Sequence, residues 1–595
     1  MNIYQKLKPE AHLSKNGFDL SYRNVFSSKV GQILPVMCKE VVPGDHFEMN
    51  VSALTRTQTL NTAAFARMKQ YFHFFFVSYQ SLWHNWDSFI SQRNNVESSY
   101  HNDSKFVPTV DLKKLKTRIC EMARTPLSDA RKFPKGLMFD IHGLPASSDR
   151  ARLLDLLGYG YTPLYKTRVV PTTDNTVNFG SRRPLVDTDP KTVPDLTSIA
   201  EYYPNIFPIL AYNKIYYDYY ANPFYEENDP AKYNVDDISC NSMATSRVDV
   251  DRVIEMLTMK YRDYKKDYFT GLLPDTQFGS VSTVGLTPSV LQLTDGRTTG
   301  SVSSLNSNLQ FYGPPSVANN KPLTVTNGVS ILDLRKAQAL QRWKETTLRA
   351  GFRHNDQALA HFGVQPRDFR DNHARYIGGI DEPINIQEIT SNSETEHVQL
   401  GDIAGKGVSA TSGQSVQFDA TEFGVIMCCY SCIPEADYNS DVLKRNLSFT
   451  QPFDFFTPEF ENLGFEAVYG YELSQYNRPE SHNVLGYAPR YSYYKTSYDE
   501  IHGEFQSGGT LSAWTTPRID FVSSALSRGL TTRFLKVDPR VMDSIFAMMQ
   551  PQNQDEKKGI TLKDYCTESY DQLLLNCYFD IKAVRPMSVI GLPSI

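Results

Sequence analysis

The chain has 595 residues, 41% of them hydrophobic, and a formal net charge of −5 at pH 7. This acidic balance excludes a strongly basic protein that coats nucleic acid through its net charge, and the lack of an 18-residue apolar run predicts no membrane-spanning helix. The 35 tyrosines and 34 phenylalanines favour β-structure with extensive contact surface, because aromatic side chains suit strands and protein interfaces.

The cysteines and the first residues both bear on the cellular compartment. Eight cysteines in a chain of this length are sparse and mostly irregularly spaced, which argues against a disulfide framework. The N-terminal residues lack the apolar segment of a signal peptide. We therefore expect synthesis in a reducing cytoplasm.

Residues 1–30 are polar with little periodicity, which predicts an extended N-terminal arm. A merely frayed terminus is the plainer alternative. If the chain encloses a nucleic acid, the basic side chains of this arm are suited to contact it. The candidates for this contact are Lys6, Lys8, Lys15, Arg23 and Lys29.

Residues 31–126 carry the first strong β signals. A β-branched run meets Pro43-Gly44, which suits a type II turn, because proline presets one φ and glycine supplies the positive one. Alternating apolar residues after the turn predict a half-buried strand. Residues 71–79 are apolar on both faces and predict a strand covered on both sides. Tryptophans at 83 and 86 then indicate a short helix.

Residues 127–330 are rich in Pro, Gly, Asn, Asp and Ser, so we expect large surface-forming insertions with loops and helices. One helix within them carries an aromatic stripe and ends at Asn222-Pro223. Core packing is the ordinary meaning of such a stripe, and a ligand platform is the alternative. If the chain assembles with copies of itself, the candidates for inter-subunit contact are Tyr212, Tyr216, Tyr219 and Tyr220.

Residues 331–414 are predicted to hold a helix, from about 331 to 352, and an extended connecting region. Four arginines on this helix share one face at 100° per residue. Such a row suits phosphates or a neighbouring subunit's carboxylates, and a solvated face is the plainer alternative. These candidates for inter-subunit contact are Arg335, Arg342, Arg349 and Arg353.

Residues 415–595 return to strands. Residues 423–432 form a continuous apolar run, and Phe579, Ile581 and Ala583 alternate with polar residues. Strong strands thus lie near both ends of the chain. A closed barrel or sandwich that pairs early strands with late ones would remove unpaired sheet edges.

Two segments resemble motifs for cofactor binding or redox chemistry, and both lack features that the motif requires. The segment Gly401–Gly407 has three residues between its first two glycines and no hydroxyl after the lysine, so we interpret it as a glycine-rich loop and not a phosphate loop. The Cys429–Cys432 pair lies in an apolar β run, which predicts buried thiols and no redox or zinc site. We predict no enzyme, no catalytic residues, no cofactor and no metal.

Eleven blocks in this chain resemble the major capsid protein family of the Microviridae, which are small single-stranded-DNA bacteriophages. They occur in the family's order, run nearly end to end and are highly specific together. The blocks are Gly31–Asp45, Leu54–Gln58, Asn61–Phe65, Ala211–Tyr220, Asp267–Pro274, His361–Val364, Tyr376–Gly379, Pro383–Ile386, Phe453–Phe460, Gly486–Tyr491 and Arg585–Pro593.

The resemblance implies a mainly β fold: an eight-stranded antiparallel jelly roll with large insertions that contain helices and long loops. It also implies a structural protein of the virion that assembles into a T=1 icosahedral shell around circular single-stranded DNA. Related lineages build protrusions at the threefold axes from an insertion. We expect residues 127–205 or 275–330 to do so here.

Several partners follow from the resemblance and from the net charge. The chain is expected to bind itself, as pentamers in the shell, and to enclose DNA. Because the chain is acidic, a small basic DNA-binding protein or cations must share the neutralisation of phosphates. A minor or pilot protein and a host surface receptor complete the expected partners, with no membrane insertion.

Two other functions remain open at this point. A β-rich carbohydrate-active enzyme would hold two carboxyl groups roughly 5–10 Å apart in a cleft. A phage receptor-binding protein would be an elongated trimer. Gel filtration separates a shell, a monomer and a trimer.

Overall fold

The computed structural model describes residues 14–58, 60, 64–91, 105–124, 140–142, 146–162, 201–238, 240–277, 293–295, 298–300, 331–350, 354–363, 373–390, 403–412, 415–439, 443–474, 483–506, 509–516, 518, 529–542, 545–546 and 571–589. Two compact units emerge. The larger comprises residues 1–274, 370–461 and 467–595, and the smaller comprises residues 275–369 and 462–466. In the described part of the chain, no helix is both long and apolar enough to cross a membrane.

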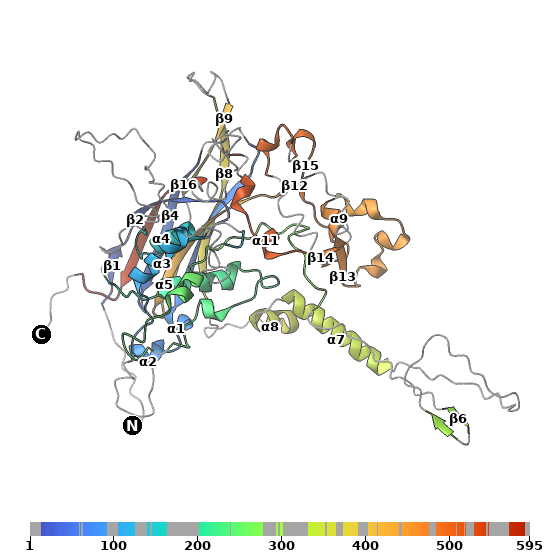
Figure 1. Cartoon of the computed structure of the whole chain (residues 1–595), viewed down its shortest axis with the longest axis horizontal. Helices are drawn as coiled ribbons and strands as arrows, with labels where there is room; N and C mark the ends of the chain where they lie inside the picture. Colours follow the sequence, from blue (N-terminus) through green and yellow to red (C-terminus); the bar gives the residue numbers. More distant parts are fainter. Residues whose placement is uncertain are drawn as a thin grey trace. The chain divides into compact units, whose positions relative to one another are not determined.

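The larger unit is built around a curled antiparallel sheet whose strands come from both ends of the chain (Figure 1). Its strands are β1 (Asn16–Asp19), β2 (Tyr22–Ser28), β3 (Leu34–Val41), β4 (His46–Thr57), β5 (Met68–Ser78), β8 (Arg375–Thr390), β9 (Ile403–Ser412), β10 (Val416–Asp419), β11 (Gly424–Pro434) and β16 (Leu573–Arg585). The red strand β16 lies between the blue strands β2 and β4, with Phe579 opposite Tyr22 and Val51.

The order of pairing is that of a jelly roll. With β1 and β2 taken as the first strand and β9 and β10 as the sixth, one half of the sheet has the order first–eighth–third–sixth. The other half is β3–β11–β5–β8, which is second–seventh–fourth–fifth. Every pairing in it is antiparallel, and β8 pairs with both β5 and β9. This confirms the predicted fold and the pairing of early with late strands.

The predicted turn between the second and third strands is confirmed in detail. Gly44 has φ of +91°, and the amide of Asp45 donates to the carbonyl of Val42 at 3.1 Å. The buried Asp45 carboxylate also accepts from the amide of Val42 at 3.0 Å. Proline followed by glycine therefore sets the register of the β3–β4 hairpin.

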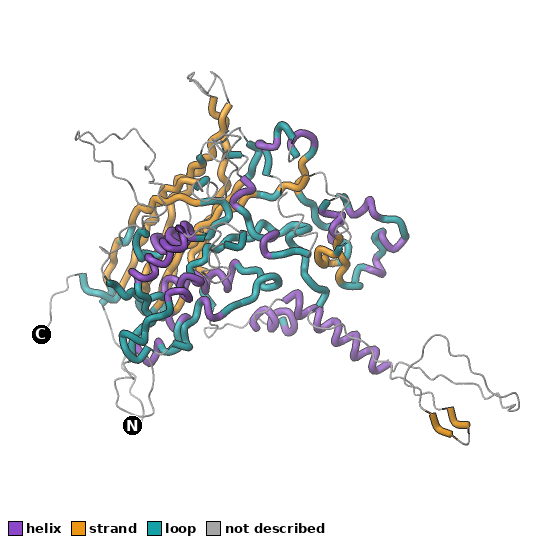
Figure 2. Tube along the Cα trace, viewed as in Figure 1, coloured by secondary structure: helices purple, strands orange, loops and turns teal. Residues whose placement is uncertain are grey.

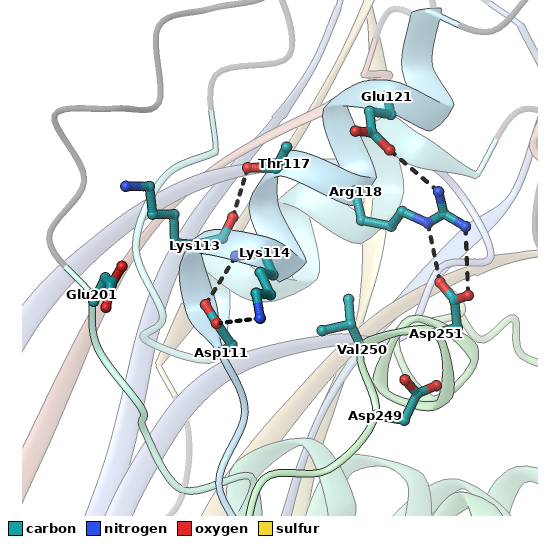
Figure 3. A pocket seen from close by; sticks show the side chains of 10 residues that line it. All are labelled: Asp111, Lys113, Lys114, Thr117, Arg118, Glu121, Glu201, Asp249, Val250 and Asp251. Carbon is teal, nitrogen blue, oxygen red and sulfur yellow. Dashed lines mark hydrogen bonds and ion pairs between the residues drawn. The ribbon is translucent and has the colours of Figure 1, made fainter. Parts of the chain in front are cut away.

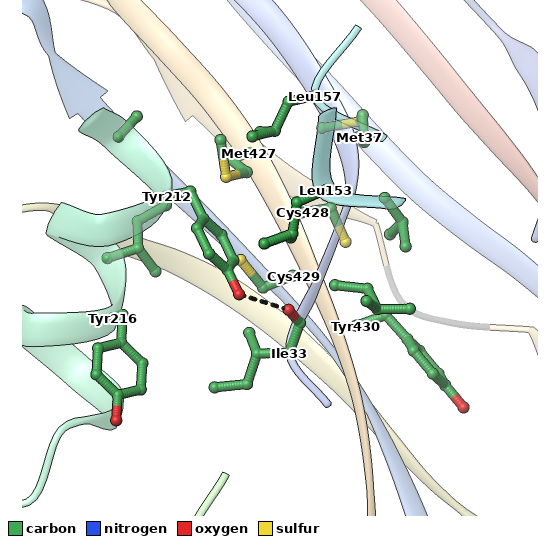
Figure 4. Close-up of a cluster of buried hydrophobic side chains, with 14 of the residues drawn as sticks. Ile33, Met37, Leu153, Leu157, Tyr212, Tyr216, Met427, Cys428, Cys429 and Tyr430 are labelled. Carbon is green, nitrogen blue, oxygen red and sulfur yellow. Dashed lines mark hydrogen bonds between the residues drawn. The ribbon is translucent and has the colours of Figure 1, made fainter. Parts of the chain in front are cut away.

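The core lies between the two halves of the sheet and beneath the helices. Strand β11 is buried at every position and β5 at seven of its eleven, because helices cover the outer face of the β3–β11–β5–β8 half (Figure 2). Cys428, Cys429 and Cys432 lie in this core (Figure 4 shows the first two), and burial raises the pKa of the Cys432 thiol to about 12. The prediction that these cysteines are buried in a strand is confirmed.

Helices fill the insertion between β5 and β8. In the larger unit they are α1 (Tyr79–Leu82), α2 (Trp86–Ile90), α3 (Leu112–Arg124), α4 (Ser147–Leu156), α5 (Phe207–Ile215), the π-helix η3 (Tyr216–Tyr220), η4 (Pro230–Lys232) and α6 (Val250–Met256). The smaller unit holds β6 (Leu293–Asp295), β7 (Thr298–Gly300), α7 (Ile331–Ala350) and α8 (His354–Phe362). The short helix expected near the tryptophans is confirmed as α1 and α2.

The insertion between β11 and β16 is made of short elements around a second apolar cluster that includes Phe269, Val468 and Phe534. The elements are β12 (Asp437–Asn439), η5 (Arg445–Ser448), η6 (Pro452–Asp454), η7 (Pro458–Phe460), β13 (Phe465–Tyr469), α9 (Gly470–Leu473), β14 (Val484–Pro489), η9 (Ser492–Tyr494), β15 (Asp499–Ile501), η10 (Gly503–Phe505), η11 (Ser512–Trp514), α11 (Thr532–Leu535) and η12 (Pro539–Met542).

Three expectations differ from the structure. Part of the predicted arm, residues 16–28, forms β1 and β2 of the jelly roll. The predicted connecting region contains β8 and β9, and residues 403–407 of the supposed glycine-rich loop belong to β9. Glycine weakens the strand pattern of β9 in the sequence, but close packing against Thr57 requires it at position 407. A Cβ at Gly407 would lie 2.5 Å from the Thr57 methyl carbon, and the amide of Gly407 donates to Thr57 Oγ1 at 2.7 Å.

Candidate nucleic-acid and inter-subunit interfaces

One face of the jelly roll is turned to solvent. Side chains of β4 and β16 alternate between buried and exposed positions, so these central strands present one face to the core and one to water. Helices α1, α4 and α5 pack on the other half of the sheet, against β3, β5 and β11. We call the solvent-facing side of β1, β2, β16, β4 and β9–β10 the open sheet face.

The predicted basic residues fall in different places. Arg23 lies on the open sheet face, where its Nε donates to Asn576 Oδ1 at 2.6 Å. Lys15 is exposed and its Nζ donates to the Gly44 carbonyl at 2.7 Å. Lys29 is only 5% exposed and lies 4.0 Å from the Asp149 carboxylate, so the prediction that it contacts DNA is wrong. Residues 6 and 8 lie outside the described residues.

Three of the four tyrosines predicted for inter-subunit contact are buried within the subunit: Tyr212, Tyr216 and Tyr220. The Tyr212 hydroxyl donates to the carbonyl of Ile33 at 2.8 Å, which ties the helix to the start of β3 (Figure 4). Burial raises the pKa of Tyr212 well above its ordinary value. The stripe is therefore core packing, and the contact prediction is wrong for these three residues. Tyr219, 41% exposed, stays a candidate.

A buried ionic network surrounds the C-terminal end of the same helix. The Lys536 ammonium lies 2.7 Å from Glu226 Oε1 and 2.8 Å from Asp263 Oδ1, and Tyr216 donates its hydroxyl proton to Glu226. The Lys260 ammonium lies 4.8 Å from the centre of the Tyr216 ring, and burial lowers the pKa of Lys260 to about 7. No local sequence motif predicts this network, because its charged residues come from three segments that are far apart in the chain.

The predicted arginine row lies in the smaller unit. Arg335, Arg342 and Arg349 are exposed on α7, and Arg353 lies outside the described residues. The Arg349 guanidinium lies 5.0 Å from the centre of the Phe465 ring. Several apolar residues of this unit are exposed as well: Leu334, Leu340, Trp343, Leu359 and Phe362. The unit therefore offers a cationic row and apolar side chains together.

The insertion between β11 and β16 carries an exposed aromatic surface. We call it the aromatic platform and define it as Leu447, Phe453, Phe455, Phe456 and Tyr494. All five side chains are large and exposed. Leu447, Phe453 and Tyr494 belong to the short helical turns η5, η6 and η9, and Phe455 and Phe456 lie between η6 and η7. Contiguous exposed apolar groups of this kind mark interaction sites.

A buried ring and two backbone hydrogen bonds support the aromatic platform. Tyr491 has φ of +61°, and its buried ring lies 5.0 Å from that of Phe456. The carboxylate of Asp454 accepts from the amides of Thr450 and Gln451 at 2.8 and 2.9 Å, and these bonds lower its pKa. A left-handed tyrosine is strained, and such strain is concentrated at functional positions.

A charged groove of about 580 Å³ runs between α3 and α6 (Figure 3). Arg118 Nε donates to Asp251 Oδ1 at 3.1 Å, and Asp111 accepts from the amide of Lys114 at the start of α3. These carboxylates thus stabilise the helices around the groove. Across the described parts of the chain, no three His, Cys, Asp or Glu side chains are placed to hold a metal ion.

Comparisons with known proteins identify the family of this chain. Residues 8–112 and 192–595 match the family model described as "Capsid protein (F protein)". Three relatives named "Capsid protein VP1" come from Chlamydia phage 1, Bdellovibrio phage phiMH2K and Spiroplasma virus 4, with 22%, 22% and 20% identity. The alignments cover 99%, 98% and 98% of this chain and 96% of each relative. The chain belongs to the Microviridae-type capsid protein (F protein) family, and it is a structural protein of the virion.

Proposed function

We propose that this capsid protein assembles through pentamers into a T=1 icosahedral shell that encloses circular single-stranded DNA. The observation that carries the proposal is the position of β16 between β1–β2 and β4, which closes one jelly roll from both chain ends. That closure leaves the insertions free to make contacts outside the sandwich. Contacts with closed rotational symmetry form rings that end, and not fibres.

The contact surfaces that support assembly are the aromatic platform and helix α7. Obligate interfaces typically bury about 2,000–5,000 Å² and concentrate aromatic and arginine side chains at their centres. The platform supplies aromatics on a rigid base, and α7 supplies Arg335, Arg342 and Arg349. We propose that both surfaces meet other copies of this chain.

The net charge supports a shared neutralisation of the DNA. At −5, each subunit adds negative charge to a shell that holds a polyanion. A small basic protein or cations must therefore accompany the DNA. A minor or pilot protein and a host receptor are further proposed partners. Residues 127–205 or 275–330 are proposed to form threefold protrusions, and most of these residues lie outside the described parts.

Electron microscopy of the purified protein, paired with gel filtration, tests the proposal. We expect megadalton spherical particles with icosahedral symmetry, or pentamers on the way to them. A monomer at high protein concentration would refute assembly, and an elongated trimer would favour a receptor-binding fibre. The carbohydrate-active enzyme is no longer a candidate, because the family is structural. Nuclease treatment of intact particles followed by DNA extraction tests the enclosed genome.

A further inference from the structure

The open sheet face consists of two halves with different chemistry. Strand registers place side chains in rows that cross β2, β16, β4 and β9. One half contains three such rows, and no position in them is acidic; beside the first row, the Asp571 carboxylate accepts from the Ser27 hydroxyl and is paired with Arg152. Its rows are Ser27–Leu574–Arg56–Val408, Val25–Asn576–Leu54–Ala410 and Arg23–Tyr578–Ser52.

The other half of the same face is rich in carboxylates. Moving along β16 past Tyr578, the next solvent-facing position is Asp580, followed by Lys582 and Val584. Four acidic side chains accompany a single lysine and His46, whose Nδ1 lies 2.7 Å from Asp419 Oδ1. These acidic residues are Asp19, Glu48, Asp419 and Asp580. The two cationic arginines thus lie apart from the acidic positions.

The acid-free half combines the groups that bind a single strand without reading its sequence. Val25, Leu574 and Tyr578 are 62%, 42% and 50% exposed, so apolar area and one aromatic ring face the solvent. Arg23 is the register partner of Tyr578, and its bond to Asn576 Oδ1 holds the guanidinium on this surface. Single-strand-binding surfaces pair stacking aromatics with cations that follow the phosphates.

Phosphates are a better match for this half than a basic protein. Two arginines with no carboxylate in their rows repel a basic partner and attract a polyanion. Arg56 is exposed on β4, and no hydrogen bond or ion pair joins its guanidinium to another described residue. The acidic half would keep the strand on the other three rows by repulsion.

We infer that the acid-free half of the open sheet face binds single-stranded DNA, with bases against Tyr578 and phosphates against Arg23 and Arg56. This assignment rests on the proposed function, which supplies the DNA. It adds the surface on which the DNA lies and the residues that hold it. It also moves the DNA contact from an extended arm to a strand face.

Full-length subunits, kept dilute so that they do not assemble, provide the test. Fluorescence anisotropy with a labelled 30-nucleotide oligothymidine is measured across a salt series. The double variant Arg23→Ala/Arg56→Ala should lower the slope of log affinity against log salt by about 1.4, since each phosphate contact in a single strand contributes roughly 0.7. Tyr578→Leu should weaken binding roughly 5- to 150-fold, the range for loss of one stacked base.

Lys582→Ala is the matched control, because it removes one cation from the acidic half of the same face. Its affinity and salt slope should equal those of the wild type. Equal losses in Lys582→Ala and in the arginine variant would overturn the assignment, as would a wild-type subunit that does not bind the oligonucleotide. Unchanged DNA affinity in the arginine variant, together with lost particle formation, would make this half a subunit contact and also overturn it.

Failure of this inference and failure of the proposed function are distinguishable. Particle formation is followed separately by electron microscopy. If wild-type particles form but the arginine and tyrosine variants bind DNA normally, only the surface assignment fails. If no particles form under any condition while the variants show the expected losses, the assembly proposal fails and the DNA surface stands.

Discussion

Two aromatic-rich regions of the larger unit differ in the exposure of their side chains to solvent. The α5–η3 helix, residues 207–220, turns three tyrosines into the core, whereas the aromatic platform presents its rings to solvent. Both regions appear in the sequence as aromatic blocks. The difference is that helical spacing gathers the tyrosines on one face, while Pro452 and Pro458 break the second block into single turns.

The comparison teaches how a capsid subunit divides its aromatic side chains. Rings at helical spacing stabilise the subunit by packing inside it. Rings on short turns have no continuous face to bury locally, so they stay available to a neighbour. Mutations in the first region should therefore affect folding, and mutations in the second should affect assembly.

The largest expected effect is on the ionic network of the helix. Lys536→Met leaves the carboxylates of Glu226 and Asp263 without their shared cation, and breaking a buried pair typically costs about 3–5 kcal/mol. Urea denaturation of the subunit measures the loss. Lys495→Met is the control, because its exposed pair with Glu461 should contribute less than about 1 kcal/mol. Equal losses in the two variants would remove the distinction between the regions.

On the platform, Phe453→Ser/Phe455→Ser should weaken assembly and spare folding. Interface hot spots contribute about 2 kcal/mol or more each, equivalent to roughly 30-fold in contact affinity. The critical concentration for particle formation, measured by gel filtration, should rise, while the free energy of unfolding should change by about 0.5 kcal/mol or less. Tyrosine at both positions keeps the rings and should restore assembly. Normal assembly of the serine variant would show that the platform is not a contact.

A smaller effect is expected for Tyr212→Phe. The variant loses the hydroxyl that donates to the Ile33 carbonyl and accepts from the amide of Lys260 at 3.3 Å. Two buried backbone groups then lack a partner, which should cost about 1–2 kcal/mol of unfolding free energy. Tyr494→Phe, the same change on the exposed platform, should leave stability unaltered. A neutral Tyr212→Phe variant would contradict the structural role of the helix.

The subtlest effect concerns pH. Because burial lowers the pKa of Lys260 to about 7, the folded subunit releases this proton near pH 7, whereas the unfolded chain holds it to about pH 10.5. The unfolded state binds more protons in that window, so stability should rise as pH increases from 7 towards 10. Lys260→Met should abolish this gain when urea denaturation is repeated at pH 6.5 and 9. The prediction would be refuted if the difference in unfolding free energy between the wild type and Lys260→Met were the same at both pH values.

Much of the jelly roll could be predicted because its strands carry local signals. Pro43-Gly44 fixed one hairpin, and the alternation of Phe579, Ile581 and Ala583 identified the last strand. Strands β8 and β9 escaped prediction because glycine weakens the β pattern. Gly379 stands where a Cβ would lie 2.6 Å from the His73 ring, so close packing and not propensity selects it.

The candidate surfaces were harder to predict than the fold. Spacing alone cannot tell whether an aromatic stripe packs inside the subunit or against a neighbour, since both faces are apolar. Lys29 shows the same problem for charge, because its burial beside Asp149 depends on a residue 120 positions away. The open sheet face is visible only after register places Arg23, Arg56 and Tyr578 on one side.

Hydrogen–deuterium exchange of free subunits and assembled particles tests the division between inner and outer aromatics most directly. Backbone amides of residues 447–460 should become protected on assembly, while those of residues 207–220 should be protected equally in both states. Protection that appears in 207–220 on assembly, with 447–460 unchanged, would contradict the account.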